Sequence, residues 1–110
     1  MMRDELMAEH RRIEVELERL AASAAAGLVD LDAFRRAYAL CREHYPREQE
    51  FLDAVHPGAA RKIASQHGEV LEIAGHVEGS TADTVYLVRR FIALAQHNII
   101  EEERDIFPLA

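Results

Sequence analysis

Apolar residues recur at spacings of three and four along most of the chain, and this spacing places them on one face of an α-helix. The repeats fall into four segments of similar length, and no run of alternating apolar and polar residues predicts a strand. The predicted buried positions are Leu6, His10, Ile13, Leu17, Leu20 and Ala24; Phe34, Ala37, Cys41, His44, Glu48, Leu52 and Val55; Ala60, Ile63, His67, Val70, Leu71, Ala74 and Val77; and Leu87, Phe91, Leu94, Ala95 and Asn98. The pattern predicts four amphipathic helices.

Glycine, proline and small polar residues separate these segments at 27–30, 56–58 and 78–81, and Phe107-Pro108 ends the last one. Asp30 or Asp32 is expected to cap the second helix, and Ser80 or Thr81 the fourth. Because short connections join helices of similar length, neighbouring helices should be antiparallel. We therefore predict an all-α, up-down-up-down four-helix bundle that forms a single domain over residues 1–110.

The composition narrows the classes of function. The formal net charge of −7 and the single lysine, Lys62, argue against binding to nucleic acid or to an anionic membrane surface, because both need clustered cations. The single cysteine, Cys41, excludes an internal disulfide and a metal site built from several thiolates. The chain shows neither a secretory signal pattern nor an apolar run of the ~20 residues that a membrane helix needs. We therefore expect a cytoplasmic protein.

The polar residues on the predicted buried faces are the candidates for chemistry. We place one histidine on the core-facing side of each helix, at depths that can coincide in an antiparallel bundle: His10, His44, His67 and His97. Glu48 follows the second of them by one turn, and the acidic run 101–103 follows the last. Buried imidazoles and carboxylates are costly without partners, and metal ions offset that cost. Since imidazole suits iron, copper and zinc, and carboxylates can bridge two ions, we predict a two-metal site.

The same residues resemble a known family. The sequence His10-Arg11-Arg12-Ile13, the spacing His44-x-x-x-Glu48, the single His67, and His97 followed by Glu101-Glu102 and Ile106-Phe107-Pro108 are similar to the hemerythrin-like (HHE cation-binding) domain. The resemblance implies a four-helix bundle with two non-haem iron ions joined by an oxo or hydroxo bridge. It also implies the ligands, which would be His10, His44, Glu48, His67, His97 and either Glu101 or Glu102.

The chain departs from this family in ways that bear on the site. Oxygen-carrying members have a further histidine where this chain has Leu71, so the four-histidine, two-glutamate pattern of sensing and repair members is closer. Glu101 has the spacing from His97 found in those members, but helical geometry places Glu102 nearer the centre of the buried face, and we favour Glu102. Pro46 removes a backbone N–H between His44 and Glu48 and is expected to kink the helix.

Other residues of these types have simpler interpretations. We expect His56 and His76 at the surface and Glu103 in solvent, and we expect Cys41 to pack as a small apolar side chain. The tyrosines could hydrogen-bond the metal ligands, but spacing alone does not select one of them.

Two functional classes remain from the sequence. The first is a di-iron protein that binds or senses a small ligand such as dioxygen, nitric oxide or peroxide, or senses iron or oxygen status. The alternative is a di-iron enzyme or a factor that repairs iron centres or handles iron. Ferritin-like oxidases use Glu-x-x-His pairs, and no glutamate here precedes a histidine at that spacing. We therefore expect a binding protein rather than an enzyme.

Overall fold

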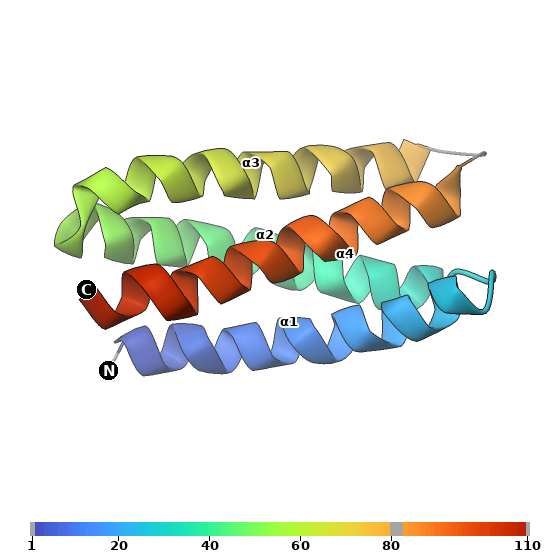
Figure 1. Ribbon diagram of the computed structural model, residues 1–110, viewed down its shortest axis with the longest axis horizontal. Coiled ribbons are helices and arrows are strands. Elements are labelled where there is room, and N and C mark those ends of the chain that lie inside the picture. The colour runs from blue at the N-terminus through green and yellow to red at the C-terminus, as the bar shows by residue number, and fades with distance from the viewer. Residues whose placement is uncertain (1, 80–82, 110) are drawn as a thin grey trace.

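The computed structural model describes residues 2–79 and 83–109. Within these ranges the chain forms four long α-helices followed by two short helical turns. They are α1 (Met2–Ala25), α2 (Leu31–Val55), α3 (Pro57–Gly79), α4 (Thr84–Glu101), the π-helical turn η1 (Glu102–Ile106) and the 3-10 turn η2 (Phe107–Leu109). Successive helices run in opposite directions in a bundle of 41 × 21 × 20 Å (Figure 1). The predicted all-α, antiparallel four-helix bundle is confirmed.

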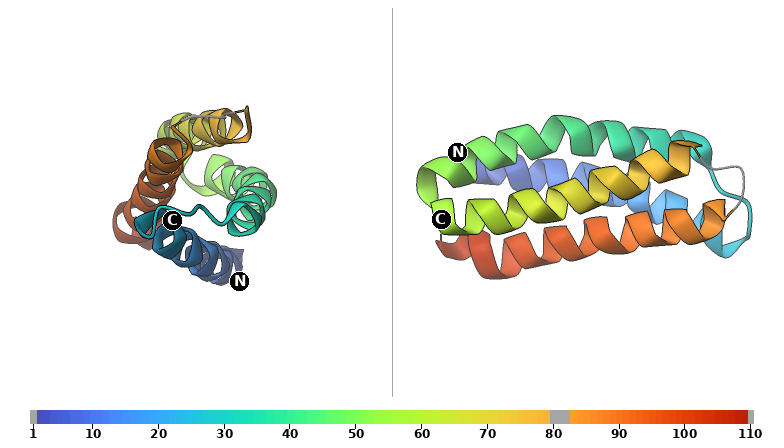
Figure 2. Two further views of the ribbon diagram at one scale, coloured as in Figure 1. Left: turned by 90° about the vertical axis from the view of Figure 1, so that its right-hand side faces the viewer. Right: turned by 90° about the horizontal axis from the view of Figure 1, so that it is seen from above.

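Each helix packs against its two neighbours around a square, so α1 contacts α2 and α4, and α3 contacts the same two helices (Figure 2). This arrangement leaves one central space that all four helices can line. Among the described residues, no helix has both the length and the apolar character that crossing a membrane requires.

The helix ends follow from local chemistry. Asp30 caps α2 by accepting a hydrogen bond from the backbone N–H of Ala33, at 3.0 Å, so it is the capping residue of the two candidates. Gly27, in the preceding turn, has a φ of 78°, which glycine adopts without strain. Pro57 begins α3, a position where its missing N–H costs no hydrogen bond. The expected capping residues Ser80 and Thr81 lie outside the described residues.

The apolar core is divided into two parts by a layer of polar side chains. The larger cluster contains Phe34, Tyr45 and Phe91, and the smaller one contains Leu6, Leu52 and Phe107. The buried polar residues that fall between the two clusters along the helices are His10, His44, Glu48, His67, Asn98 and Glu102. The predicted stripes of α1 and α3 are buried except for half-buried Leu71, and on α2 only Val55 is exposed.

The buried face of α4 is rotated from the predicted one. Val88, Phe91, Ala95 and Asn98 are buried, whereas Leu87 and Leu94 are only partly covered. The helix then widens into the turn η1, in which the N–H of Phe107 donates to the carbonyl oxygen of Glu102, five residues earlier. Such π-turns change which side chains face inward. Here Glu102, Ile106 and Phe107 are buried at the end of the bundle.

Candidate metal centre

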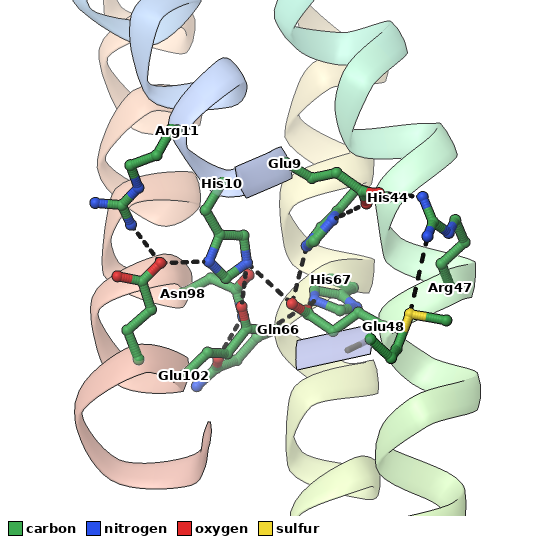
Figure 3. Close-up of polar contacts among 12 residues, drawn as sticks. Glu9, His10, Arg11, His44, Arg47, Glu48, Gln66, His67, Asn98 and Glu102 are labelled. Atoms are coloured by element: carbon green, nitrogen blue, oxygen red, sulfur yellow. Dashed lines mark hydrogen bonds and ion pairs between the residues drawn. The ribbon is translucent and has the colours of Figure 1, made fainter. Parts of the chain in front are cut away.

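Five buried side chains from all four sides of the bundle converge in the polar layer: His10 from α1, His44 and Glu48 from α2, His67 from α3, and Glu102 at the start of η1 (Figure 3). Ligand atoms of four of them, all except His67, lie within 4.8 Å of one another. The Nε2 atom of His67 lies 2.9 Å from Glu48 and 3.1 Å from Glu102, so this ring belongs to the same cluster. The α2 helix continues through Pro46, and Glu48 reaches the centre of the layer.

The ring of His10 is held between carboxylates on both sides. Its Nε2 lies 2.9 Å from Glu48 and 3.1 Å from Glu102, and its Nδ1 lies 2.7 Å from Glu103. Arg11 forms an ion pair with Glu103, and the ring of Phe107 stacks on the imidazole at 5.5 Å. Burial alone would lower the pKa of His10, but its hydrogen bonds to Glu102 and Glu48 outweigh burial and raise the pKa to about 10.

His44 repeats this arrangement on the opposite side. Its Nε2 lies 2.9 Å from Oε2 of Glu48, and its Nδ1 lies 2.7 Å from Glu9. Arg47 forms an ion pair with Glu9, as Arg11 does with Glu103. Because a carboxylate only accepts, each Nδ1 donates a hydrogen bond outward, away from the cluster. A histidine that donates from one nitrogen to a carboxylate presents the other to a metal with its orientation fixed.

His67 is oriented by stacking. The ring of Tyr45 lies parallel to it, with centroids 3.7 Å apart and 5° between the planes. Burial would lower the pKa of His67, but its hydrogen bonds to Glu102 and Glu48 raise it. Cys41, one turn from Tyr45, is a fully buried free thiol whose pKa burial raises to about 11. A neutral, packed thiol is what the sequence predicted at this position.

The two carboxylates at the centre have opposite pKa shifts. Burial would raise the pKa of Glu48, but hydrogen bonds from Glu102, His10 and His44 hold it well below its usual range. Burial raises the pKa of Glu102, and the bond to Glu48 raises it further. The neutral form of Glu102 can therefore share its proton with Glu48, as closely spaced carboxyl groups do.

Acceptor atoms outnumber donors in this layer. The Nε2 hydrogen of His10 donates to Oε2 of Glu48, and that of His67 donates to Oε2 of Glu102. Within residues 2–79 and 83–109, Oδ1 of Asn98 is a buried side-chain atom with no hydrogen-bond partner. Oε1 of Glu48 and Oε1 of Glu102 accept no aligned hydrogen bond there, although Nε2 of His67 and Nε2 of His10 lie 2.9 and 3.1 Å from them. Buried oxygens without well-formed hydrogen bonds are costly, and here three occur in one polar layer. Their surplus lone pairs fit a cation bound among them.

The placement of His97 in the core is wrong. Its side chain is 69% exposed and lies 3.4 Å from Glu101, outside the buried polar layer. The physical reason is the rotation of α4, because Asn98 rather than His97 shares a face with Ala95 and Glu102. Asn98 is fully buried and donates from Nδ2 to Oε1 of Gln66 at 2.8 Å. The fourth corner of the layer therefore carries an amide where the sequence predicted an imidazole.

The two candidate glutamates, Glu101 and Glu102, have different surroundings. Glu102 is fully buried and contacts His10 and His67, whereas Glu101 accepts a hydrogen bond from Gln66 at 2.6 Å and forms an ion pair with Lys62. Glu101 is therefore placed beside the cluster and Glu102 within it, which is the position that we favoured for Glu102.

Two further glutamates were missed or misplaced by the sequence analysis. Glu103 was expected in solvent, but it contacts His10, and Glu9, which was not singled out, contacts His44. Glu9 directly precedes His10 in sequence, and Glu103 directly follows Glu102. The chain has many glutamates, however, and their spacing alone does not distinguish these two. As expected, His76 is exposed, while His56 accepts the N–H of Ala59 at the start of α3.

Comparison of the chain with protein-family models, with curated proteins and with solved structures found no significant match.

Proposed function

We propose that this protein binds non-haem iron in the cluster of His10, His44, Glu48, His67 and Glu102. The observation that carries the proposal is the convergence of three imidazole Nε2 atoms on two fully buried carboxylates, Glu48 and Glu102. Among the described residues, Oε1 of each carboxylate accepts no aligned hydrogen bond, although an imidazole Nε2 lies within 3.1 Å of it. A purely structural polar network gains nothing from such poorly bonded oxygens, whereas a metal site uses them as ligands.

The type of donor supports iron. Imidazole and carboxylate together, without thiolate, suit iron and similar divalent transition metals. The only cysteine, Cys41, faces Tyr45 within the larger apolar cluster, and it is not among the ligand atoms that converge. Softer ions such as Cu⁺, which prefer sulfur, find no suitable ligand here.

The number of donors supports two ions. Three ring nitrogens and four carboxylate oxygens exceed what one octahedral ion accepts, and Glu48 and Glu102 lie where each can present oxygens to both sides of the layer. Carboxylates that bridge are typical of two-metal sites. Two iron ions joined by an oxo or hydroxo bridge are therefore the cofactor that we propose.

The surroundings support a small ligand. The two apolar clusters close the layer from both ends of the bundle, so no large substrate reaches it along the bundle axis. A pocket of about 130 Å³ between α1 and α2 is lined by Glu9, Arg12, Ile13, Leu40, Glu43, His44 and Arg47. This volume suits molecules of a few atoms. We infer that the protein binds or senses a diatomic ligand such as dioxygen or nitric oxide.

The test is to load the protein with Fe²⁺ without air, remove unbound metal, and add nitric oxide or air in separate samples. The proposal predicts a change in the visible spectrum with nitric oxide, which saturates at no more than the bound iron, and near-ultraviolet absorption after air. Bound iron whose spectrum responds to neither gas would contradict the ligand-binding function. Continuous oxygen consumption with an added reductant would instead favour the alternative, a di-iron enzyme.

A further inference from the structure

Asn98 occupies the corner of the polar layer that no histidine fills. It lies one helical turn before Glu102, so both side chains project from the same face of the chain. The Asn98 side chain is fully buried, and its Oδ1 has no hydrogen-bond partner among the described residues. An amide oxygen in this condition is costly unless something binds it.

A chain of polar contacts fixes which end of the Asn98 amide is free. Lys62, on α3, forms an ion pair with the carboxylate of Glu101. An ionised carboxylate only accepts hydrogen bonds, so Gln66 must turn Nε2 toward Glu101, at 2.6 Å. Oε1 of Gln66 then faces Asn98, which must donate from Nδ2, at 2.8 Å.

The orientation of both amides therefore follows from the charge on Glu101 and not from a choice between equivalent rotamers. The contacts run from Lys62, which is exposed on α3, through Glu101 and Gln66 to the buried layer. These contacts end at Asn98, whose Nδ2 donates to Gln66 and whose Oδ1 has no partner among the described residues.

We propose that Oδ1 of Asn98 is a further, neutral oxygen ligand of the metal centre, and that Gln66, Glu101 and Lys62 are positioning residues that hold it. This inference rests on the proposed metal binding. An amide oxygen in place of a fourth imidazole makes the donor set richer in oxygen, and oxygen donors suit Mn²⁺ and similarly hard ions better than they suit Zn²⁺ or Cu²⁺. Asn98 is thus a specificity-determining residue as well as a ligand.

The first test compares Mn²⁺ and Zn²⁺ binding, each by calorimetry, in the unaltered protein and in Asn98→Leu. Leucine keeps a side chain of similar size and removes the amide. We expect Mn²⁺ affinity to fall about tenfold or more, with a smaller loss for Zn²⁺. Gln66→Leu should lower Mn²⁺ affinity by less, because Asn98 remains but its orientation is no longer fixed. Gln96→Leu, which changes an exposed amide on the same helix, should leave both affinities unchanged.

The metal-free melting temperature separates ligation from a structural role. Because Asn98→Leu removes a buried oxygen without a partner, the metal-free variant should melt at or above the temperature of the metal-free unaltered protein, although it binds Mn²⁺ more weakly. A residue with a structural role alone would lower metal-free stability and leave the affinity ratio of the two ions unchanged.

A second measurement uses the unaltered protein and so does not depend on whether an Asn98 variant folds. The side-chain amide resonance of Asn98 in ¹⁵N-labelled protein should shift when Zn²⁺ saturates the site, while that of Gln96 should not. An unshifted Asn98 resonance, or equal Mn²⁺ affinity in Asn98→Leu, overturns this inference and leaves the proposed metal binding intact. Failure of the unaltered protein to bind either ion overturns the proposed function, and the inference falls with it.

Discussion

Nδ1 of His10 lies 2.7 Å from Oε2 of Glu103, and this contact turns the opposite nitrogen of the ring into the buried layer. The two residues are 93 positions apart in sequence, so the contact joins α1 to the turn η1. It fixes both the tautomer and the direction of the imidazole. His44 and Glu9 form the same pair between α2 and α1, which indicates that two rings are preoriented in the same way.

The first prediction concerns Glu103. Replacing Glu103 with Gln removes the charge that accepts from Nδ1 of His10, and we expect metal affinity to fall roughly 10–100-fold, as loss of such a partner does elsewhere. Affinity is measured by competition with a chromophoric chelator. Glu14→Gln is the matched control, because Glu14 also pairs with Arg11 but does not touch the cluster. Equal losses in the two variants would mean that only the charge near Arg11 matters.

The second prediction is that His44 binds the metal and His97 does not. His44→Leu replaces a buried ring whose Nε2 lies 2.9 Å from Glu48, and it should sharply reduce the metal bound per chain. His97→Ala should leave the metal content unchanged, since this side chain is largely exposed. The measurement is elemental analysis after loading and desalting. A loss of metal in His97→Ala comparable to that in His44→Leu would contradict the arrangement of α4.

The third prediction concerns pH. In the metal-free protein Glu48, Glu102 and Glu103 face His10, and its pKa of about 10 keeps the ring protonated at pH 7. A ligand must lose its proton, so metal binding at pH 7 should release protons, and the apparent affinity should rise with pH toward 10, by about tenfold per unit for each proton released. Calorimetry in buffers of different ionisation enthalpy measures this release. A binding enthalpy that does not depend on the buffer would contradict the prediction.

The raised pKa of His10 also determines how the stability of the metal-free fold depends on pH. A histidine whose pKa is raised on folding stabilises the fold fully below its unfolded value of 6.5, and this stabilisation is lost as pH rises through about 10. The melting temperature of the metal-free protein should therefore fall between pH 7 and pH 10 on account of His10. His10→Leu should reduce that slope, and a slope unchanged by the substitution would show that other groups cause it.

The fourth prediction concerns metal removal. A ligand present at about 100 times its Kd stabilises the folded state by roughly 2.7 kcal/mol, which for a chain of this size raises the melting temperature on the order of 10 °C. Melts followed by circular dichroism with Fe²⁺, without air, and with a chelator should differ by at least this much. Coinciding melts would be at odds with a metal held by the buried layer.

Most of the fold could be predicted from the sequence, because each of the first three helices has a narrow apolar stripe. The stripes through Leu17, Ala37 and Val70 leave little choice of register, and they place His10, Glu48 and His67 correctly in the core. These three positions follow from helical periodicity alone, since a polar residue inside such a stripe must be buried with it.

The register of α4 could not be read in the same way. Leu87, Val88, Leu94 and Ile100 make this helix apolar on more than one side, so its periodicity allows a shift of one residue, about 100°. This shift in register places Asn98, and not His97, on the buried face of α4. The turn η1 adds a second difficulty, because a π-turn interrupts the period of 3.6 and changes how the 101–103 run faces the core. Glu103 was misplaced for this reason.

Whether the buried layer is a two-metal site is decided by the number of metal ions that bind per chain. The protein is freed of metal, loaded with excess Fe²⁺ without air, desalted, and assayed for iron and for protein concentration. We expect close to two iron ions per chain in the unaltered protein, and far fewer in a variant that carries both Glu48→Gln and Glu102→Gln. An iron content of one or none per chain in the unaltered protein, with the helical spectrum of the fold intact, would contradict a two-metal site.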